Sequence, residues 1–445
     1  MPRQFWVETL GCPKNQVDSD KLTGTLLADG LMGAARPEEA DLVVVNTCAF
    51  IEAARQESID VILALGDARK TGAELVVTGC LAERYGDELA EAMPEVSAIA
   101  PFGVPVTLSA TRRAREVGGG LRVPSFDLLE LPRPPASAPW AYVKVAEGCD
   151  RNCGFCAIPS FRGKQRSRSM ESILAEVDGL GVSEVVLVAQ DLAAFGRDQG
   201  RGQRQILPLI TAVAEQVPWV RLLYLYPSEL TDELIDTIGN TGVPYFDLSL
   251  QHVSPPLMRR MRRWGSGEVF APRIEVIRRR EPEAAFRSNF IVGYPGETEA
   301  DHDALLAFVS GVQLDWCGFF AYSEEEGTYG AGLEPKVPRS LIDERLNELR
   351  QLQDSITATK RDELIGRRVE VLIDRPGVAR STREAPEIDG IVQVSEALAV
   401  GQFHWVEITA ATGPDLVAEP VAVTEGETAT RPGANRPAGP PRCAL

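Results

Sequence analysis

Three cysteines within eight residues constrain this chain more than any other feature. Cys149, Cys153 and Cys156 form a C-x3-C-x2-C array directly after an apolar run, 141–145, that predicts a strand. Full cysteine ligation of a cubane iron–sulfur cluster takes four thiolates, so three thiolates on one loop would leave one iron open. Zinc would need a fourth ligand, and no further His or Cys lies close in the sequence. The alternative is three unrelated buried cysteines, although only 8 of the 445 residues are Cys.

The composition is that of a globular chain without export or membrane signals. Its 445 residues suggest about three domains. No run approaches the roughly 18 apolar residues of a membrane span, and the amino-terminal residues lack the apolar core of a signal peptide. We therefore expect a cytoplasmic protein without a membrane partner, in which clustered cysteines bind metal. The histidines are too scattered for a histidine-based metal site: His252, His302 and His404.

The formal net charge of −18 disfavours a polyphosphate backbone as the main partner, because such binding depends on clustered Lys and Arg. A negatively charged enzyme instead suits a basic protein as its partner. A local basic stripe could still exist within the acidic total.

Strand and helix patterns alternate over residues 1–125. Apolar runs occur at 5–10, 41–47 and 74–79, and helical patterns lie at 19–29 and 52–69. Strand, helix and strand at this spacing predict a parallel α/β domain.

Each of the three strands in this segment ends at a cysteine: Cys12, Cys48 and Cys80. The carboxyl ends of parallel strands share one edge of the sheet, where ligands bind, so these cysteines should converge in space. Together they would offer a second cluster three thiolates and one open iron. The alternative is that each is a small buried hydrophobic residue.

A proline-rich segment at 126–139 predicts a linker. Beyond it, residues 140–364 repeat a strand–helix rhythm, with apolar runs at 141–145, 184–190, 219–226, 245–251, 286–292 and 314–322. Six repeats predict a partial (βα)6 barrel whose functional loops lie at the carboxyl ends of the strands. The loop that carries Cys149 follows the first strand and therefore belongs to that rim.

The chain becomes all-β after a charged helical pattern at 339–364. Short strand patterns at 368–373, 390–394 and 404–408 predict a small closed barrel within residues 365–430. Its five arginines and nine carboxylates, counted up to Glu419, give a net charge of −4. A negative domain binds phosphates poorly. We expect most of these charged side chains to be exposed to solvent. We expect residues 431–445 to be disordered. Two further cysteines are interpreted as incidental: Cys317 and Cys443.

The C-x3-C-x2-C spacing resembles the signature of the radical S-adenosylmethionine (SAM) enzymes. The resemblance implies that Cys149, Cys153 and Cys156 are the catalytic cluster ligands, that SAM chelates the open iron, and that SAM cleavage gives a 5′-deoxyadenosyl radical. The run 291–298 resembles the SAM-adenine strand of that barrel, whereas other polar residues of the rim are singly explained by turn chemistry. The SAM-contacting candidates are Phe155, Gln190, Ser249, Gln251, Gly293, Gly296, Glu297 and Tyr322.

The order of features over residues 4–426 looks like the methylthiotransferases, which join an auxiliary-cluster domain, a radical SAM core and a TRAM domain. The run 11–15, Gly-Cys-Pro-Lys-Asn, resembles the branch that modifies ribosomal protein S-twelve of the small subunit, whereas the tRNA-modifying branch typically has Gln-Met at Pro13 and Lys14. Further matches lie at 158–163, 225–228, 250–254 and 385–390. Gly154 inside the cluster loop is a minor departure that leaves the cysteines untouched.

This resemblance implies two 4Fe-4S clusters, with Cys12, Cys48 and Cys80 holding the auxiliary one, and SAM in two roles. It implies insertion of a methylthio group at the β-carbon of an aspartate in the ribosomal protein. It also implies a low-potential electron donor as a partner and no dependence on tRNA.

Three alternatives remain. A tRNA methylthiotransferase of the same fold is disfavoured by Pro13 and Lys14 and by the acidic carboxy-terminal barrel. A non-catalytic two-cluster electron carrier would need no SAM pocket, so the run 293–298 weighs against it. A zinc-stabilised RNA-binding module would be distinguished by its metal content.

Overall fold

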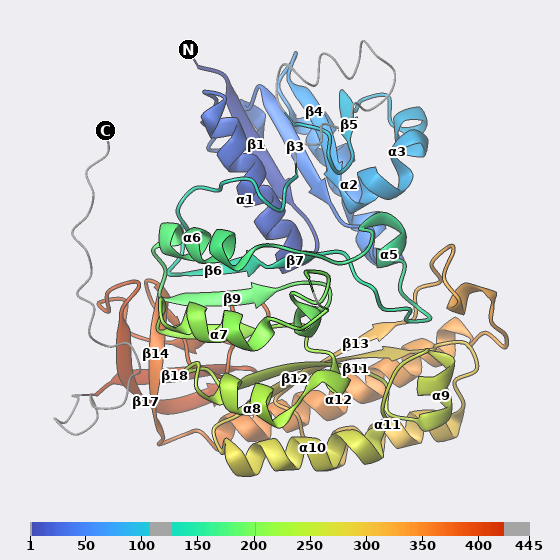
Figure 1. Ribbon diagram of the computed structural model, residues 1–445, viewed down its shortest axis with the longest axis vertical. Helices are drawn as coiled ribbons and strands as arrows, with labels where there is room; N and C mark the ends of the chain where they lie inside the picture. Colours follow the sequence, from blue (N-terminus) through green and yellow to red (C-terminus); the bar gives the residue numbers. More distant parts are fainter. Residues whose placement is uncertain (1, 107–126, 201, 422–445) are drawn as a thin grey trace.

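The amino-terminal sheet is parallel throughout, as the alternating patterns predict. The computed structural model describes residues 2–106, 127–200 and 202–421, and places this sheet at the top of Figure 1. The strand order is β2-β1-β3-β4-β5, with bounds β1 (Gln4–Thr9), β2 (Met32–Gly33), β3 (Leu42–Thr47), β4 (Glu74–Gly79) and β5 (Ala98–Ala100). The edge strands β2 and β5 are not predictable from the sequence, because two or three residues are too few to show a strand periodicity.

Helix α1 (Pro13–Ala28) begins six residues before the expected start at Ser19. Cys12 is its N-cap residue, and Pro13 occupies the first turn, where proline is favoured because its fixed φ suits a helix. The earlier start places Lys14 and Asn15 at the strand edge. The other elements of this domain are α2 (Glu52–Ala68), α3 (Cys80–Ala92) and the short 3-10 helix η1 (Pro37–Glu39).

The central domain is the predicted partial barrel of six parallel strands. Two three-stranded sheets, β6-β9-β10 and β11-β12-β13, are joined by a bridge between Leu225 and Leu248. The strands are β6 (Trp140–Lys144), β9 (Glu184–Val188), β10 (Trp219–Leu222), β11 (Tyr245–Gln251), β12 (Ala285–Val292) and β13 (Trp316–Ala321). A short antiparallel pair, β7 (Ala146–Glu147) and β8 (Arg166–Ser167), closes the base of the loop that carries Cys149.

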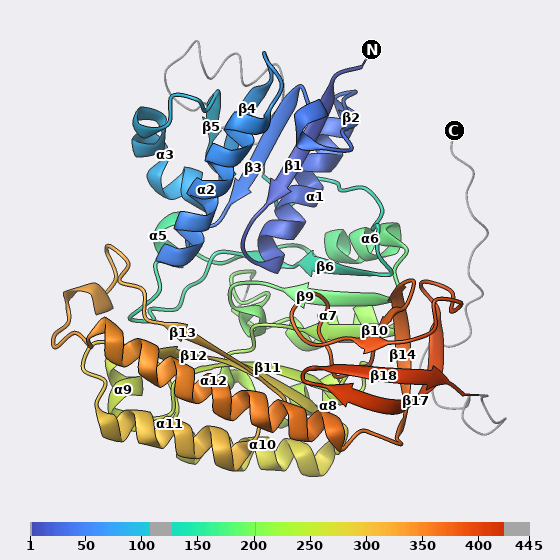
Figure 2. The same cartoon turned by 180° about the vertical axis from the view of Figure 1, so that it is seen from behind.

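Helices cover the outer face of this barrel, as Figures 1 and 2 show. They are α6 (Met170–Leu180), α7 (Ile206–Ala214), α8 (Asp232–Gly239), α9 (Pro255–Arg260), α10 (Gly267–Arg280), α11 (Glu299–Val312) and α12 (Arg339–Asp362). The short helix α5 (Ile158–Phe161) instead packs against the amino-terminal domain. The central domain also contains the 3-10 turns η2 (Leu192–Ala194), η3 (Pro227–Glu229) and η4 (Gly330–Gly332). Strand β11 shows the packing: Leu248 and Leu250 enter the core shared with the helices. Ser249 and Gln251 alternate with them and therefore face the inside of the barrel.

The carboxy-terminal domain is the small closed barrel that the sequence predicts, in the order β14-β15-β16-β18-β17. Its strands are β14 (Arg368–Arg375), β15 (Val378–Arg380), β16 (Val392–Gln393), β17 (Phe403–Thr412) and β18 (Asp415–Pro420). The predicted disordered tail, residues 431–445, lies outside the described residues, and so does Cys443.

Buried ion pairs fix this small barrel to the amino-terminal ends of the central strands. Arg380 lies 2.7 Å from Glu184 of β9, and the same carboxylate pairs with Arg221 of β10 at 2.8 Å. Glu384 likewise pairs with Arg361 of α12 at 2.5 Å. The expectation of solvated charges is therefore wrong for Arg380 and Glu384, because both are buried in the interface between the two domains.

The segment between the first two domains packs against α1. Lys21 donates to the carbonyl of Leu129 at 2.7 Å, and Arg133 pairs with Asp20 at 2.6 Å. Gly24 leaves room for the backbone at Pro132, since a β-carbon there would lie 2.7 Å from the Pro132 carbonyl oxygen. Among the described residues, no helix is both long and apolar enough to cross a membrane.

Candidate functional site

The three amino-terminal cysteines each follow a strand of the same sheet edge. Cys12 follows β1, Cys48 follows β3, and Cys80 opens α3 after β4. Gly11 lets two of these turns approach: its φ is +94°, and a β-carbon there would lie 2.7 Å from the Cβ of Cys48. A larger residue at position 11 would force the turns apart, so this glycine is required by the approach.

Side-chain amides join the three strand ends. Asn15 donates to the carbonyl of Leu10 at 2.8 Å and to that of Thr47 at 3.0 Å. Asn46 donates to the carbonyl of Asn15 at 2.9 Å. These bonds tie the turns after β1 and β3 to the start of α1, so the predicted convergence of the cysteines rests on a buried polar network.

Burial has the largest single effect on the pKa of each of these thiols, and it acts to raise it. Burial, together with the neighbouring Cys12 and Cys80, raises the pKa of Cys48 to about 12. Burial also raises the pKa of Cys80, against the opposing charge of Arg162. At Cys12 burial acts in the same direction, but Lys14 and Arg162 outweigh it and lower the pKa. Cys12 therefore lies near enough to both Cys48 and Cys80 to raise the pKa of each.

Cys149, Cys153 and Cys156, the barrel cysteines, lie on one loop. Hydrogen bonds on both sides of Gly154 hold this loop in place. The backbone N–H of Gly154 donates to the carbonyl of Met261 at 2.7 Å, and the N–H of Gly330 donates to the Gly154 carbonyl at 2.6 Å. A β-carbon at position 154 would lie 2.6 Å from the hydroxyl of Tyr294. The glycine that departs from the family pattern is therefore required by the packing of the loop.

Two arginines contact this second group of thiols. The backbone N–H of Arg151 lies 3.4 Å from the Sγ of Cys149, and Nη1 of Arg263 lies 3.4 Å from the Sγ of Cys153. Burial raises the pKa of Cys149 to about 11 and that of Cys156 to about 12. The charge of Arg263 opposes the rise at Cys156. No local sequence signal points to Arg263, which comes from the segment after α9.

Arg162 links the two groups of cysteines. It follows α5, six residues after Cys156, and its Nη2 lies 3.0 Å from the Sγ of Cys80 and 2.7 Å from the Oδ1 of Asn15. Its Nη1 lies 2.8 Å from Glu147, two residues before Cys149. In Figure 1 the carboxyl ends of β1, β3 and β4 point toward this α5 and β7 region. The run 158–163 resembles the family in sequence, but its local pattern does not indicate this role for Arg162.

The positive charge of Arg162 is balanced by the carboxylates of Glu147 and Asp18. Burial opposes ionisation of Glu147, but Arg162 and Lys144 outweigh it and hold the pKa of that carboxyl well below its usual range. Lys144 also pairs with Asp18 of α1. The contact between the first two domains is therefore a charge network directly beside the thiols.

The structure brings several predicted SAM-contacting residues to the inner face of the rim. Gln190 donates to Glu147 at 2.7 Å, and its Oε1 is buried without a partner. The Tyr322 hydroxyl is also buried without a partner, and its ring packs edge-on against Tyr294 at 5.0 Å. Phe155 packs on the same aromatic cluster. Buried orphan polar atoms of this kind fit a site that receives a polar ligand.

Arg263 also connects Ser249 to the cluster loop, because its Nη2 donates to the Ser249 carbonyl. Gln251 ends β11 in the left-handed region, with φ of 71°. Ser249 is thus connected to Cys153 through Arg263, and Gln251 lies two residues further along the same strand.

The remaining predicted residues of the rim make contacts within the chain. The carboxylate of Glu297 accepts from the N–H of Gly293 at 2.5 Å and pairs with Arg345 at 2.9 Å. Gly293 leaves room for Ile342 of α12, and Gly296 leaves room for the side chain of Arg260. The run 291–298 is therefore a tightly braced turn at the end of β12.

Each group supplies three thiols, the donor set of a cubane cluster with one open iron. Among the residues that the structure describes, no three His, Cys, Asp or Glu side chains are placed to hold one metal ion. In a cubane each thiolate binds a different iron, so a cluster needs thiols that surround a larger space. Cys317, by contrast, packs against the core beneath the helices, as an incidental cysteine would.

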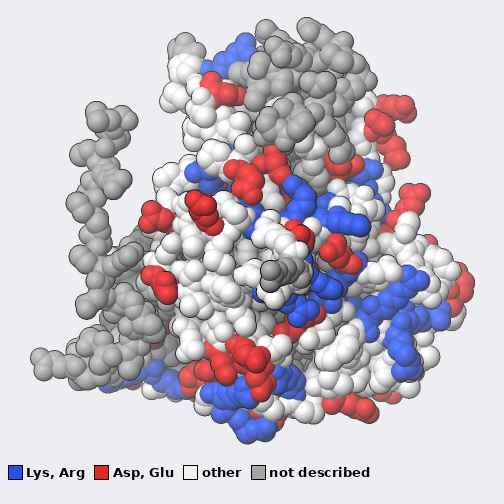
Figure 3. Space-filling view, viewed as in Figure 1, with Lys and Arg blue, Asp and Glu red and all other residues white. Residues whose placement is uncertain are grey.

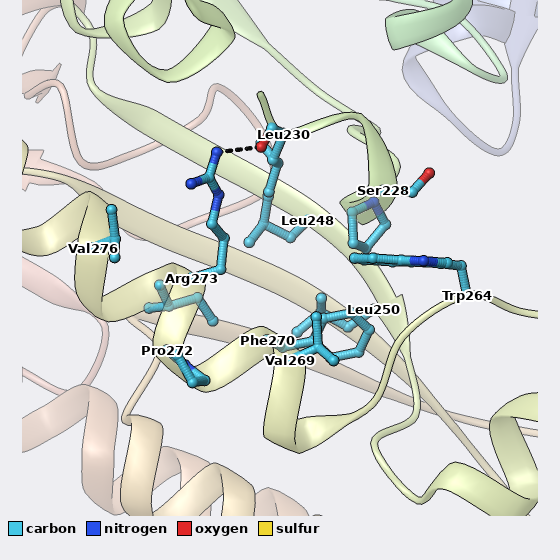
Figure 4. A pocket seen from close by; sticks show the side chains of 12 residues that line it. Ser228, Leu230, Leu248, Leu250, Trp264, Val269, Phe270, Pro272, Arg273 and Val276 are labelled. Atoms are coloured by element: carbon cyan, nitrogen blue, oxygen red, sulfur yellow. Dashed lines mark hydrogen bonds between the residues drawn. The ribbon is translucent and has the colours of Figure 1, made fainter. Parts of the chain in front are cut away.

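A separate cavity of about 320 Å³ lies on the outer side of β11 (Figure 4). It is lined by apolar side chains that include Leu248, Leu250 and Phe270, and Arg273 closes it by donating to the carbonyl of Leu230. Trp264 at its border is 47% exposed. Because Ser249 points to the other side of the strand, this cavity does not belong to the cysteine site.

Basic side chains gather near the rim in spite of the acidic total. Figure 3 shows Lys and Arg side chains over the region where α9 lies in Figure 1. Exposed Arg259 and Arg262 belong to this segment, and Arg262 stacks on Tyr329 at 3.6 Å. A net charge of −18 therefore does not describe the surface around the site.

Family models cover each of the three domains. Residues 4–101 match a model described as uncharacterized protein family UPF0004, residues 143–309 match the radical SAM superfamily, and residues 365–421 match the TRAM domain. In fold, the chain is similar to the radical SAM methyltransferase TsrM from Kitasatospora setae, with a TM-score of 0.53 at 14% identity over 90% of this chain and 84% of that one.

Proteins of known name are similar to this chain over nearly the full length of both. The ribosomal protein uS12 methylthiotransferase RimO of Moorella thermoacetica is 43% identical over 91% of this chain and 96% of its own. The protein of that name from Koribacter versatilis is 39% identical over 94% of this chain and 96% of its own. The chain therefore belongs to the methylthiotransferase family of radical SAM enzymes, in the branch of the ribosomal protein uS12 methylthiotransferases.

Proposed function

We propose that this protein inserts a methylthio group at the β-carbon of an aspartate in ribosomal protein uS12. Relatives that are 39–43% identical bear the name of that activity. The observation that carries the proposal is the contact of Arg162 with Cys80 and Glu147, which brings two groups of three thiols to one buried network. A reaction that needs both a radical and a sulfur donor requires two separate sets of thiols, and here one buried network joins the two.

The cysteines would divide the two tasks between them. Cys149, Cys153 and Cys156 would hold the cluster that binds SAM, and a second cluster would be held by Cys12, Cys48 and Cys80. When bound, the two clusters and SAM supply a radical that removes hydrogen from an unactivated carbon, and the sulfur and methyl group to be inserted. The proposed domains, residues 1–125, 140–364 and 365–430, would contribute the second cluster, the first cluster and the small barrel.

The chain's own side chains would hold and orient these groups. Arg263 at Cys153 and Arg162 at Cys80 place a positive charge beside a thiol in each group, which favours the thiolate form that binds iron. The orphan atoms of Gln190 and Tyr322 would accept or donate hydrogen bonds to SAM. Cys48, Cys80 and Cys149 are buried, and exclusion of water around them would protect a radical from side reactions.

The test uses the full chain, reconstituted without oxygen and supplied with SAM and a strong low-potential reductant in place of the physiological electron donor. Iron and sulfide analysis should give about eight irons per chain, as two cubanes require. Mass spectrometry should find the mass of a methylthio group on uS12 and no change in tRNA treated in parallel. Modified tRNA with unmodified uS12 would overturn the proposal, and so would zinc in place of iron.

A further inference from the structure

Lys14 is buried but makes no ion pair with any carboxylate of the described chain. It is the second residue of α1, two positions after Cys12, and only 8% of it is exposed. Its ammonium group lies 3.4 Å from the centre of the Tyr224 ring. The other buried lysines show what is normal: Lys21 pairs with Glu176 at 3.2 Å, and Lys144 pairs with Glu147 at 2.7 Å.

The position of Lys14 is also electrostatically unfavourable. The first turn of a helix carries partial positive charge and favours acidic side chains, yet the first turn of α1 has none. A buried ammonium group without a carboxylate partner loses hydration that a ring face restores only in part. Neither helix formation nor packing explains a lysine at this point. Its partner is therefore either the neighbouring Cys12 thiolate, whose pKa it lowers, or a group from outside the chain.

Tyr224 is held in a strained conformation beneath this ammonium group. Its φ is 65°, in the left-handed region that bulky residues rarely adopt, and its N–H donates to the Oδ2 of Asp247 at 2.9 Å. Asp247 also pairs with Arg287 at 3.6 Å, so this carboxylate is already engaged by two other groups. Such strain collects at binding sites, where the surroundings hold one side chain in a required direction.

We propose that Lys14 binds the carboxylate of the target aspartate. This inference rests on the proposed function, because it takes the modified residue to be an aspartate. In aspartate the β-carbon is bonded directly to the carboxylate carbon. A charge-assisted hydrogen bond from the ammonium group to that carboxylate therefore fixes the reacting carbon one bond away, beside the turn that carries Cys12. The rival role is that Lys14 only offsets the charge of the Cys12 thiolate.

The test is a double-mutant cycle on binding, read by fluorescence anisotropy with labelled uS12 and the reconstituted enzyme. The enzymes are wild type, Lys14→Met and the control Lys70→Met, whose side chain is 40% exposed and pairs with Asp41 away from the cysteines. The ligands are uS12 and uS12 with the target aspartate changed to asparagine. Iron content and 5′-deoxyadenosine release are measured for every enzyme.

Wild type and Lys70→Met should bind the aspartate form roughly 30-fold or more tightly than the asparagine form, as loss of one partner of a buried charge pair implies. Lys14→Met should bind both forms equally and weakly, with unchanged iron content. If Lys14→Met still discriminates between the two forms, the inference is wrong. A loss of iron with discrimination retained would support the rival role and would also overturn the inference. Failure of the proposed function is a separate result, namely wild-type enzyme that forms no methylthio product on uS12.

Discussion

Arg162 donates from its Nη2 to the Sγ of Cys80 over 3.0 Å, although 82 residues separate the two along the chain. The same guanidinium contacts Glu147, two residues before the barrel cysteines. One side chain therefore positions both groups of thiols relative to each other. Asp18 also accepts from its Nη1 and Asn15 from its Nη2, so both ends of the buried guanidinium are engaged within the protein.

Replacing Arg162 by Met should remove the auxiliary cluster and keep the radical cluster. Cys80 would lose the one cationic contact that the described part of the chain gives it, and the pKa of that buried thiol, already raised by burial, would rise further. Iron content should fall from about eight to about four per chain, while 5′-deoxyadenosine release continues. Arg166→Met is the control, since Arg166 is exposed and pairs with Asp127. Full iron content in the Arg162 variant would contradict this positioning role.

Two cysteine variants separate the tasks of the clusters. Cys12→Ala should still release 5′-deoxyadenosine from SAM but form no methylthio product, because only the sulfur-donating cluster is affected. Cys153→Ala should release no 5′-deoxyadenosine under reducing conditions. Chromatography of 5′-deoxyadenosine and mass spectrometry of uS12 read the two outcomes. Product from Cys12→Ala, or appreciable 5′-deoxyadenosine from Cys153→Ala, would rule out the respective assignment.

Gly154→Ala should displace the loop that carries the barrel cysteines. The new methyl group would lie 2.6 Å from the Tyr294 hydroxyl and 3.2 Å from the Met261 carbonyl, and overpacking of this kind costs about 1–3 kcal/mol. We expect 5′-deoxyadenosine release to fall by roughly tenfold or more, which corresponds to about 1.4 kcal/mol.

The matched control for this change is Gly179→Ala in α6, where an added β-carbon meets no atom within 4 Å. Alanine favours the helix at such a position, so this variant should keep wild-type activity and stability. Combining Gly154→Ala with Tyr294→Phe removes the closest contact and should restore part of the activity. Equal activity of Gly154→Ala and wild type would show that the loop tolerates a side chain.

Local sequence patterns were enough to predict the parts of the fold that repeat along the chain. The strands that end at Cys12, Cys48 and Cys80 were predictable because apolar runs and their turns are local features. The convergence of these cysteines followed from one rule about parallel sheets. The six barrel strands were predictable in the same way, and their bounds differ from the expected ranges by a few residues at one or both ends.

The contacts that complete the site could not be predicted in this way. Arg263 reaches Cys153 across 110 residues, and no periodicity encodes such a contact. Arg380 was expected to be solvated at the surface. Its buried partner, Glu184, belongs to another domain, and the sequence does not show that the two meet. In the sequence, Lys14 indicates only the branch of the family that modifies the ribosomal protein. That it makes no ion pair with a described carboxylate is visible only in the folded chain.

The buried carboxyl of Asp389 provides a pH-dependent test of how the small barrel is docked. Its Oδ2 accepts hydrogen bonds from the Tyr245 hydroxyl at 2.6 Å and the Ala385 N–H at 2.9 Å. Burial nevertheless raises its pKa to about 6, against the opposing charge of Arg287. The folded chain therefore keeps this proton to a higher pH than the unfolded chain. From about pH 4 to about pH 6 the folded state binds more protons, so raising the pH lowers the stability that this group contributes.

Asp389→Asn keeps the hydrogen-bond acceptor but cannot ionise, so the free energy of unfolding of wild type relative to the variant should fall as the pH rises. Between pH 5 and pH 7 the fall should be about 1 kcal/mol, and above pH 7 the difference should stay constant. Urea denaturation of both reconstituted proteins over pH 5–8 measures it, and Glu344→Gln on an exposed position of α12 controls for the loss of one negative charge. A difference that does not change with pH would show that Asp389 is already ionised at pH 5, with Arg287 and Tyr245 outweighing the cost of its burial.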